Sequence, residues 1–484
     1  MDLDPETCHR ALDARDPRFD GLFYVGVSTT GIYCRPVCPA RRPGRDRCTF
    51  YARPAEAEKA GFRACFRCRP ELAPGAAPMD ATPRLVGAAV ARIDAGFLNR
   101  HAVPDLAAAL GVSERHLRRT LEEHLGVGPL ELAATRRLAL ARQLLADTTL
   151  PITDIAFLAG YGSVRRFNAA FLASVGKPPS AARRPRTPAE STGVTAPETL
   201  ALRLAYRPPF DWERLLAFLR GRRVAGVETM DDGVWRRGVV LEGHTGVIAV
   251  SPVPGQNALR VALSASLAPV LMPLTARLRA LFDLDARPDV IAATLGADPI
   301  FAAAVAHRPG LRLPGAFDGW EMAVRAVLGQ QVSVAAATTV CGRLVDRFGS
   351  VIPGLPVGID RAFPAPAVLA AASESALCGV GMPGARARTL QALGALVAEG
   401  GVILEPGTPP EPTMAALEAL PGIGPWTASY IAMRALRWPD AFPAGDLAVR
   451  KALGTPPPRS VLAHAESWRP WRAYAVVHLW HLEP

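Results

Sequence analysis

The stretch Leu420-Pro421-Gly422-Ile423-Gly424-Pro425-Trp426-Thr427-Ala428 decides the fold of the C-terminal half of the chain. Its Pro-Gly-x-Gly core predicts a tight turn, because glycine adopts positive φ and allows close backbone approach. Helical spacing over 414–419 and 426–436 makes this turn a hairpin between two helices. The amides and positive dipole end of the second helix would bind a phosphate. Gly422 and Gly424 are therefore candidate DNA-binding residues that hold one strand without reading its sequence.

A single carboxylate follows this hairpin. The residues 442–446 interrupt the helical pattern, which resumes over 447–453, so Asp446 lies at or beside a helix start. Taken alone, Asp446 is best interpreted as an N-cap, since Asp is a preferred capping residue. Trp426 and Tyr430 lie four residues apart on one helix, which simple core packing also produces. The residues by themselves leave the structural and functional interpretations open.

From Leu200 onward the sequence resembles the helix-hairpin-helix DNA glycosylases, and closely the AlkA type, 3-methyladenine DNA glycosylase II. The matching stretches are 327–334, 420–428, 430–436, 446–453 and 478–480. The resemblance implies a DNA-3-methyladenine glycosylase that flips its substrate base out of the duplex, with Asp446 as the catalytic acid. The residues that it implies for substrate binding are Trp426, Tyr430, Trp480 and Gln331, of which Gln331 would wedge into the minor groove.

The residue types suit this chemistry. N-alkylation makes a purine cationic and a good leaving group, so one carboxylate beside the developing oxocarbenium ion suffices. Aromatic faces would favour a cationic base by roughly 1 to 2 kcal/mol. Trp426 stands where bifunctional relatives carry a lysine, so a monofunctional enzyme is expected. No cysteine follows Cys378, so no iron–sulfur cluster is expected.

Four of the eight cysteines fall as Cys34-x₃-Cys38 and Cys65-x₂-Cys68. This spacing predicts one Zn²⁺ in a Cys₄ site, because the surrounding segment is too small to be stabilised by burial alone. A zinc ion that only stabilises the fold is the ordinary interpretation of such a pattern.

The flanking stretches 19–27, 29–38 and 60–70 resemble the zinc domain of the adaptive-response regulator Ada. The resemblance implies that Cys34 accepts a methyl group from an alkylated DNA phosphate, once and without turnover. Loss of one thiolate charge would then strengthen DNA binding. A zinc site with an inactive acceptor stays open as an alternative. No Pro-Cys-His-Arg motif occurs, so repair of O6-methylguanine is not expected.

The middle of the chain contains two helix-turn-helix patterns, at 105–117 and 152–171, which resemble the tandem pair of AraC-type regulators. Each has a helix, a glycine turn, a serine cap and a second helix with basic residues. The candidate DNA-binding residues are Arg115, Arg118, Arg119, Arg165, Arg166 and Asn168. An ordinary solvated helix face is the alternative for each arginine.

The 484 residues, net charge of +11 and pI near 9.7 favour a polyanionic partner. The expected partner is double-stranded DNA, both damaged DNA and promoter DNA. RNA polymerase is a candidate second partner, and the protein is expected to act as a monomer. No signal peptide or long apolar stretch occurs, so no membrane partner is expected, and the bacterial cytosol, in association with the nucleoid, is the expected location.

These patterns predict a multidomain α+β protein. The expected domains are a small Cys₄ zinc domain at 1–76, an all-α tandem helix-turn-helix domain at 84–184, a mixed α+β lobe at 200–266 and a helical helix-hairpin-helix domain at 267–484. Linkers are expected at 73–83 and 183–199. The predicted function combines glycosylase, methyl acceptor and transcription regulator; the alternative is a regulator whose C-terminal half only binds DNA.

Overall fold

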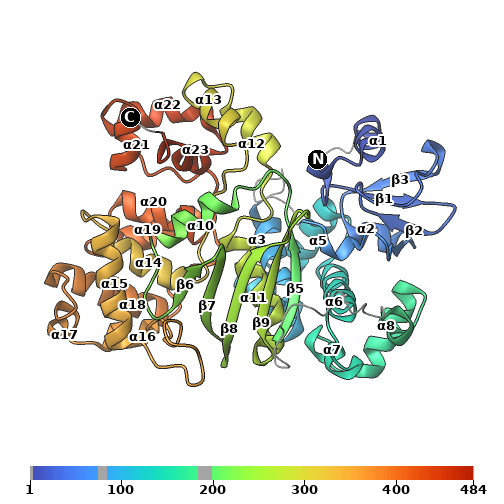
Figure 1. Ribbon diagram of the computed structural model, residues 1–484, viewed down its shortest axis with the longest axis horizontal. Coiled ribbons are helices and arrows are strands. Elements are labelled where there is room, and N and C mark those ends of the chain that lie inside the picture. Colours follow the sequence, from blue (N-terminus) through green and yellow to red (C-terminus); the bar gives the residue numbers. More distant parts are fainter. Residues whose placement is uncertain (1–3, 75–83, 184–198, 483–484) are drawn as a thin grey trace. The chain divides into compact units, whose positions relative to one another are not determined.

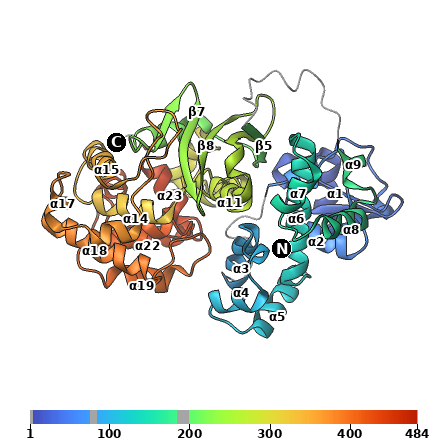
Figure 2. The same cartoon turned by 90° about the horizontal axis from the view of Figure 1, so that it is seen from below.

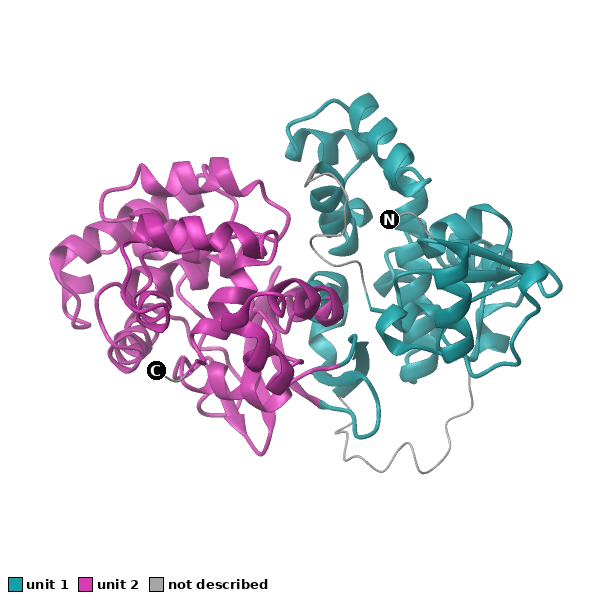
Figure 3. Cartoon of the chain, turned by 90° about the horizontal axis from the view of Figure 1, so that it is seen from above, with its two compact units in different colours: residues 1–208, 252–276, 284–286 teal, residues 209–251, 277–283, 287–484 magenta. Residues whose placement is uncertain are grey.

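The computed structural model describes residues 4–74, 84–183 and 199–482 (Figure 1). The chain forms two compact units (Figure 3): unit 1 comprises residues 1–208, 252–276 and 284–286, and unit 2 comprises 209–251, 277–283 and 287–484. The predicted multidomain α+β fold is confirmed. Both predicted linkers lie almost wholly outside the described residues.

Unit 1 begins with a small four-stranded sheet in the order β3-β1-β2-β4. β1 pairs antiparallel with β2 and β3, and β2 pairs parallel with β4. Position 26 in β1 requires glycine, because a Cβ there would lie only 2.8 Å from the Tyr51 ring. The elements are α1 (Pro5–Ala14), β1 (Tyr24–Val27), β2 (Ile32–Cys34), β3 (Cys48–Tyr51), α2 (Pro54–Lys59) and β4 (Arg63–Ala64), with short 3-10 turns at Pro17–Phe19, Arg45–Arg47 and Pro70–Leu72.

The next part of unit 1 is helical, and α6 joins its two groups of helices (Figure 2). Ser113 and Ser163 cap α5 and α8 by accepting hydrogen bonds from the backbone N–H groups of His116 and Arg166. The predicted serine caps are therefore present in both helix-turn-helix motifs. The helices are α3 (Arg84–Asp94), α4 (Val103–Ala109), α5 (Glu114–Leu125), α6 (Pro129–Asp147), α7 (Ile152–Leu158), α8 (Val164–Val175) and α9 (Pro179–Ala182), with a 3-10 turn at Phe97–Asn99.

Unit 1 also contains the first and last strands of the predicted mixed lobe. β5 (Thr199–Ala205) and β9 (Ala258–Ser264) pair antiparallel over their full length. The 3-10 turn Ala265–Val270 and α11 (Leu271–Leu281) follow β9.

Unit 2 contains the other strands of the lobe and a large helical bundle. β7 pairs antiparallel with β6 and β8. The bundle core lies among α14, α15, α18 and α20, with Val327, Leu344, Leu390 and Ile431 fully buried. The elements are α10 (Trp212–Arg220), β6 (Glu228–Asp231), β7 (Val234–Leu241), β8 (His244–Pro252), α12 (Pro288–Leu295), α13 (Pro299–His307), α14 (Gly319–Leu328), α15 (Val334–Phe348), α16 (Pro366–Ala371), α17 (Glu374–Cys378), α18 (Gly384–Ala398), α19 (Pro410–Glu418), α20 (Pro425–Arg434), α21 (Leu447–Ala452), α22 (Pro458–His464), the 3-10 turn Ala465–Trp468 and α23 (Arg472–Leu479). Of the helices in the described ranges, none has the length and apolar character needed to span a bilayer.

A buried ion pair joins the strands and helices of unit 2. Arg237 of β7 binds Glu321 of α14, and both side chains are less than a tenth exposed. Arg325, one turn further along α14, donates to Glu321 at 3.0 Å. Burial opposes the ionised form of Glu321, but the two guanidinium groups outweigh it and lower the pKa of this carboxyl.

Replacement of Glu321 by alanine should destabilise unit 2 by about 3 to 5 kcal/mol, because it leaves the buried Arg237 charge without its partner. All eight tryptophans lie in unit 2, so denaturant unfolding followed by tryptophan fluorescence reports this unit. Glu374→Ala is the matched control, because its ion pair with Arg388 is exposed and should contribute about 0 to 1 kcal/mol. Equal losses in both variants would contradict the prediction.

Candidate functional site

The helix-hairpin-helix turn joins α19 to α20. Gly422 has φ of +89°, and a Cβ at this position would lie 2.2 Å from Thr389 Oγ1, so both conformation and space require glycine. The Thr389 hydroxyl donates to the Pro421 carbonyl at 2.9 Å. Gly424 is the N-cap of α20, and a Cβ there would meet nothing within 4 Å. The start of α20 thus presents an open backbone surface suited to a phosphate.

Asp446 is the N-cap of α21, as its position in the sequence predicts. Its Oδ1 accepts hydrogen bonds from the backbone N–H groups of Ala448 at 3.0 Å and Val449 at 3.1 Å. The same carboxylate also accepts from two indoles, Trp426 Nε1 at 3.1 Å and Trp480 Nε1 at 3.3 Å. Four N–H donors therefore converge on one carboxylate, which as an anion is a pure acceptor.

Three of the predicted substrate-binding residues surround Asp446. Trp426 and Tyr430 stack with their ring centroids 5.4 Å apart and their planes at 9°. Tyr430 and Trp480 lie 6.2 Å apart at 50°. All three rings are half-buried, so they form walls beside the carboxylate with surface left for a flat ligand. The arrangement can hold an aromatic base against an anion.

Gln331, the fourth predicted substrate-binding residue, lies apart from these rings in the short turn between α14 and α15. It is exposed and has a positive φ of 55°, which is uncommon for a residue with a side chain. Its neighbour Gln330 donates from Nε2 to the Gly422 carbonyl at 2.8 Å and to Thr427 Oγ1 at 2.9 Å. Gln330 thereby ties this turn to the hairpin, a link that the sequence did not reveal.

Two further side chains of the site come from α10 and the turn after it. Phe218 stacks on Trp480 with centroids 6.0 Å apart and planes at 12°. The Arg222 guanidinium lies 3.7 Å from the Phe218 ring centroid. Sequence reasoning missed both residues, because nothing local connects them to a hairpin two hundred positions away.

Arg434 is a further residue that sequence reasoning missed. Its Nη1 donates to the Tyr430 hydroxyl at 2.7 Å, and its Nη2 donates to the Gly315 carbonyl at 3.1 Å. Burial lowers the pKa of Arg434 to about 10. Burial alone would raise the pKa of Tyr430, but Arg434, Arg222 and Arg325 outweigh it and lower this pKa. The spacing of Tyr430 and Arg434, four apart on one helix, was the signal that could have found this contact.

The four predicted zinc ligands lie together in unit 1. Their sulfur atoms all lie within 4.8 Å of one another, and a tetrahedral site with Zn–S bonds of about 2.3 Å needs separations of about 3.8 Å. Backbone N–H groups of Arg35 and Arg67 donate to Cys68 Sγ at 3.3 Å and Cys65 Sγ at 3.4 Å. Cys34 is half-buried, whereas the other three are buried. The donor set fits one Zn²⁺.

The predicted DNA-binding side chains of the helix-turn-helix motifs are exposed on α5 and α8. On α5, Leu117 and Leu121 are buried on the opposite face, and Arg118 pairs with Glu114 at 2.7 Å. On α8, Phe167 and Phe171 are buried. The exposed residues are Arg115, Arg118 and Arg119 of α5 and Arg165, Arg166 and Asn168 of α8.

Four protein families match successive parts of the chain. The metal binding domain of Ada matches residues 7–71, and a helix-turn-helix domain matches 106–185. The AlkA N-terminal domain matches 201–318, and the HhH-GPD superfamily of base excision DNA repair proteins matches 324–455. Together with the cysteine geometry, these matches make Cys34, Cys38, Cys65 and Cys68 a Cys₄ zinc site. They also make the chain a DNA-binding protein with a DNA glycosylase domain.

Individual proteins are similar to larger parts of the chain than each family model covers. DNA-3-methyladenine glycosylase 2 of Escherichia coli is 38% identical over 58% of this chain and 96% of its own length. A solved 3-methyladenine DNA glycosylase from Archaeoglobus fulgidus covers 57% of this chain and 96% of its own, with 21% identity and a TM-score of 0.49. The probable bifunctional transcriptional activator/DNA repair enzyme AlkA of Mycobacterium tuberculosis is 43% identical over 99% of this chain and 97% of its own length. The chain therefore belongs to the family of bifunctional transcriptional activator and DNA repair enzymes of the AlkA type.

Proposed function

We propose that this protein is a monofunctional DNA-3-methyladenine glycosylase that excises alkylated purines, joined to a zinc-dependent methyl acceptor and a transcription regulator. One observation carries the glycosylase proposal: Asp446 is buried at the N-terminus of α21 and faces the indole N–H groups of Trp426 and Trp480. A capping role alone accounts for the two backbone hydrogen bonds. It does not account for two indoles aimed at the same carboxylate beside half-buried rings.

The reaction follows from this geometry. An alkylated purine flipped out of the duplex would lie against Trp426, Tyr430 and Trp480. The N-glycosidic bond breaks with its electron pair going to the base, which leaves as a neutral molecule. The Asp446 carboxylate stabilises the positive charge that develops on the sugar. Water then attacks the anomeric carbon and its proton passes to the solvent, so the products are the neutral free base, an abasic sugar and one proton.

The arginines of the site refine the expected selectivity. Arg222 already covers one face of Phe218, and Arg434 lies 5.5 Å from the Tyr430 ring. These guanidinium groups reduce the attraction of the aromatic walls for a second cation. The preference for a cationic base therefore depends mainly on Asp446 and less on cation–π contacts than the sequence suggested.

The zinc domain supports a second chemical step. Cys34 is the half-buried member of the Cys₄ set, and backbone N–H donors reach Cys38, Cys65 and Cys68. A zinc-bound thiolate stays nucleophilic at neutral pH. The Cys34 sulfur would attack the methyl carbon of a DNA phosphotriester; the S–C bond forms as the C–O bond breaks, and the phosphodiester anion leaves. The acceptor becomes a thioether and is used once.

The exposed basic faces of α5 and α8 suit the major groove, so we infer regulated binding to promoter DNA. RNA polymerase is the proposed partner in activation, with the protein acting as a monomer. The proposed domains are 1–76, 84–184, 200–266 and 267–484, and Gln331 is the proposed wedge because it is exposed beside the hairpin. The competing function is a regulator whose C-terminal half binds DNA without cleaving it.

Asp446→Asn should lower the rate of 3-methyladenine release from alkylated DNA by about 10²- to 10⁴-fold. Asn still caps α21, but its amide N–H₂ faces an N–H donor of the site, so we expect a stability loss of about 1 to 3 kcal/mol, which denaturant unfolding measures separately. Single-turnover release of labelled base measures the rate. Asp298→Asn is the matched control, since Asp298 caps α13 and accepts from Trp468 Nε1 at 2.7 Å. Equal release rates in wild type and Asp446→Asn would refute the assigned role of Asp446, and no release by the wild type would favour the regulator that only binds DNA.

Exposure of the zinc-loaded protein to DNA carrying methylphosphotriesters should add one methyl group to Cys34. Peptide mass spectrometry locates the added methyl group, and Cys34→Ala should remain unlabelled. A label on Cys38, Cys65 or Cys68 would contradict the assignment of the acceptor, and an unlabelled wild-type protein would leave the zinc with a structural role alone.

A further inference from the structure

The second cysteine pair of the zinc centre contacts α6 of the helix-turn-helix region. The Cys65 carbonyl accepts a hydrogen bond from Arg142 Nη2 at 3.0 Å. Arg142 also pairs with Glu71 at 3.2 Å, and both side chains are less than a tenth exposed. The Phe66 ring lies 5.3 Å from the Arg142 guanidinium and 5.8 Å from Lys177 Nζ, which follows α8. A turn of the metal site thus lies between two helices that belong to the DNA-reading part.

The residue after the last zinc ligand extends this contact. Arg69 has a left-handed backbone with φ of 52° and donates to Glu71 at 3.0 Å and to Asp147 at 2.9 Å. Asp147 is the last residue of α6. The five residues 65–69, here called the zinc turn, therefore supply two metal ligands and three contacts to the helices. Because these residues are consecutive, the sulfur positions and the helix contacts cannot change independently.

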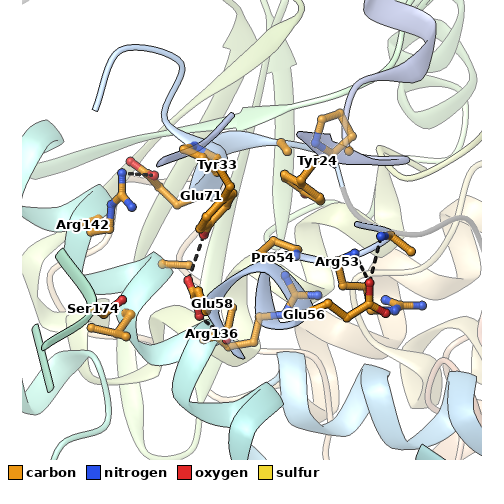
Figure 4. A pocket seen from close by; sticks show the side chains of 18 of the residues that line it. Tyr24, Tyr33, Arg53, Pro54, Glu56, Glu58, Glu71, Arg136, Arg142 and Ser174 are labelled. Atoms are coloured by element: carbon orange, nitrogen blue, oxygen red, sulfur yellow. Dashed lines mark hydrogen bonds and ion pairs between the residues drawn. The ribbon is translucent and has the colours of Figure 1, made fainter. Parts of the chain in front are cut away.

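The first cysteine pair is linked to α6 as well. Tyr33, directly before Cys34, donates to Glu58 at 2.8 Å, and Thr135 of α6 donates to the other oxygen of Glu58 at 2.6 Å (Figure 4). Thr135 and Arg142 lie seven residues apart and so share one face of α6. Burial raises the pKa of Glu58. Both halves of the metal site are therefore connected to the same helix face.

These links border a cavity of about 260 Å³ lined by Tyr33, Glu58, Glu71 and Arg142 (Figure 4). Ala55 of α2 packs with apolar side chains of the helical region; the rest of the contact between the zinc domain and α6 consists of separate polar links around a cavity. Hydrogen bonds and ion pairs need defined positions of both partners, so such a contact depends on the zinc turn being held in one conformation.

We propose that zinc binding at the Cys₄ site and ordering of α6 against the zinc domain are one coupled equilibrium, transmitted by Arg142 and the zinc turn. With the metal bound, the Cys65 carbonyl and Arg69 are fixed where α6 meets them. Without it, Arg142 loses the Cys65 carbonyl and Asp147 loses Arg69, while Glu71 and Arg203 remain as partners. The C-terminal half of α6 then opens more often. The coupling goes beyond the proposed function and does not depend on methyl transfer.

Hydrogen exchange of the full-length protein tests the first half of the proposal. Removal of zinc with a chelator should increase amide exchange in residues 138–147 by about 5- to 150-fold, the usual range of coupling between two sites. Exchange in α14 and α20 of unit 2 should stay unchanged and serves as the internal control. Unchanged exchange in residues 138–147 after complete zinc removal would overturn the proposal.

The effect of the helix contact on zinc affinity tests the second half of the proposal. If zinc stabilises the contact, loss of the contact must weaken zinc binding by the same factor. Arg142→Met keeps an apolar stem and removes the donors, so its zinc affinity in competition with a chromophoric chelator should fall measurably. The fall should not exceed the factor seen in exchange, because the Arg69–Asp147 and Glu58–Thr135 links remain. Arg137→Met is the matched control, because Arg137 lies on the same helix but donates to Asn99 at 2.7 Å. Wild-type affinity in Arg142→Met, or an equal loss in Arg137→Met, would overturn the proposal.

Discussion

The hydrogen bonds that converge on Asp446 organise the C-terminal half of the molecule. Two of them cap the start of α21. The other two come from the indole of Trp426, which belongs to α20, and from the indole of Trp480, which directly follows α23. One carboxylate thus orients three helical segments and two walls of the site. The structure shows Asp446 as the N-cap of α21, and this position is compatible with the catalytic role that we propose for the same carboxylate. A rigidly held anion needs no rearrangement when charge develops on a neighbouring sugar.

Local patterns predicted much of this site. The glycines of the hairpin, the capping position of Asp446 and the grouping of the four cysteines all depend on residues close together in the chain. Phe218 of α10 escaped prediction because it stacks on the distant Trp480, and Arg222 escaped because it lies over Phe218; such long-range packing leaves no periodic signal. Gln330 escaped because its importance comes from two acceptors on the hairpin, while the resemblance drew attention to its neighbour Gln331.

For the strands of the mixed lobe, too, local patterns predicted the elements but not how they group. Alternating apolar residues predicted strands between 200 and 263, and β5 to β9 lie there. The pattern could not reveal that β5 and β9 would group with unit 1 while β6 to β8 group with unit 2. Likewise, cysteine spacing predicted the metal site but not its contacts with α6. Those contacts require Arg142 to reach a carbonyl 77 residues earlier in the chain.

The arginines beside the aromatic walls affect the end of the catalytic cycle. In the proposed reaction the base is a cation before cleavage and is attracted by Asp446; after cleavage the base is neutral, and this attraction ends. Arg222 lies over the Phe218 ring and Arg434 lies 5.5 Å from the Tyr430 ring, so these two rings add little cation–π attraction of their own for the base. Departure of the free base from the pocket is thereby made easier by the chemistry itself, and accumulation of excised bases should inhibit the enzyme only weakly.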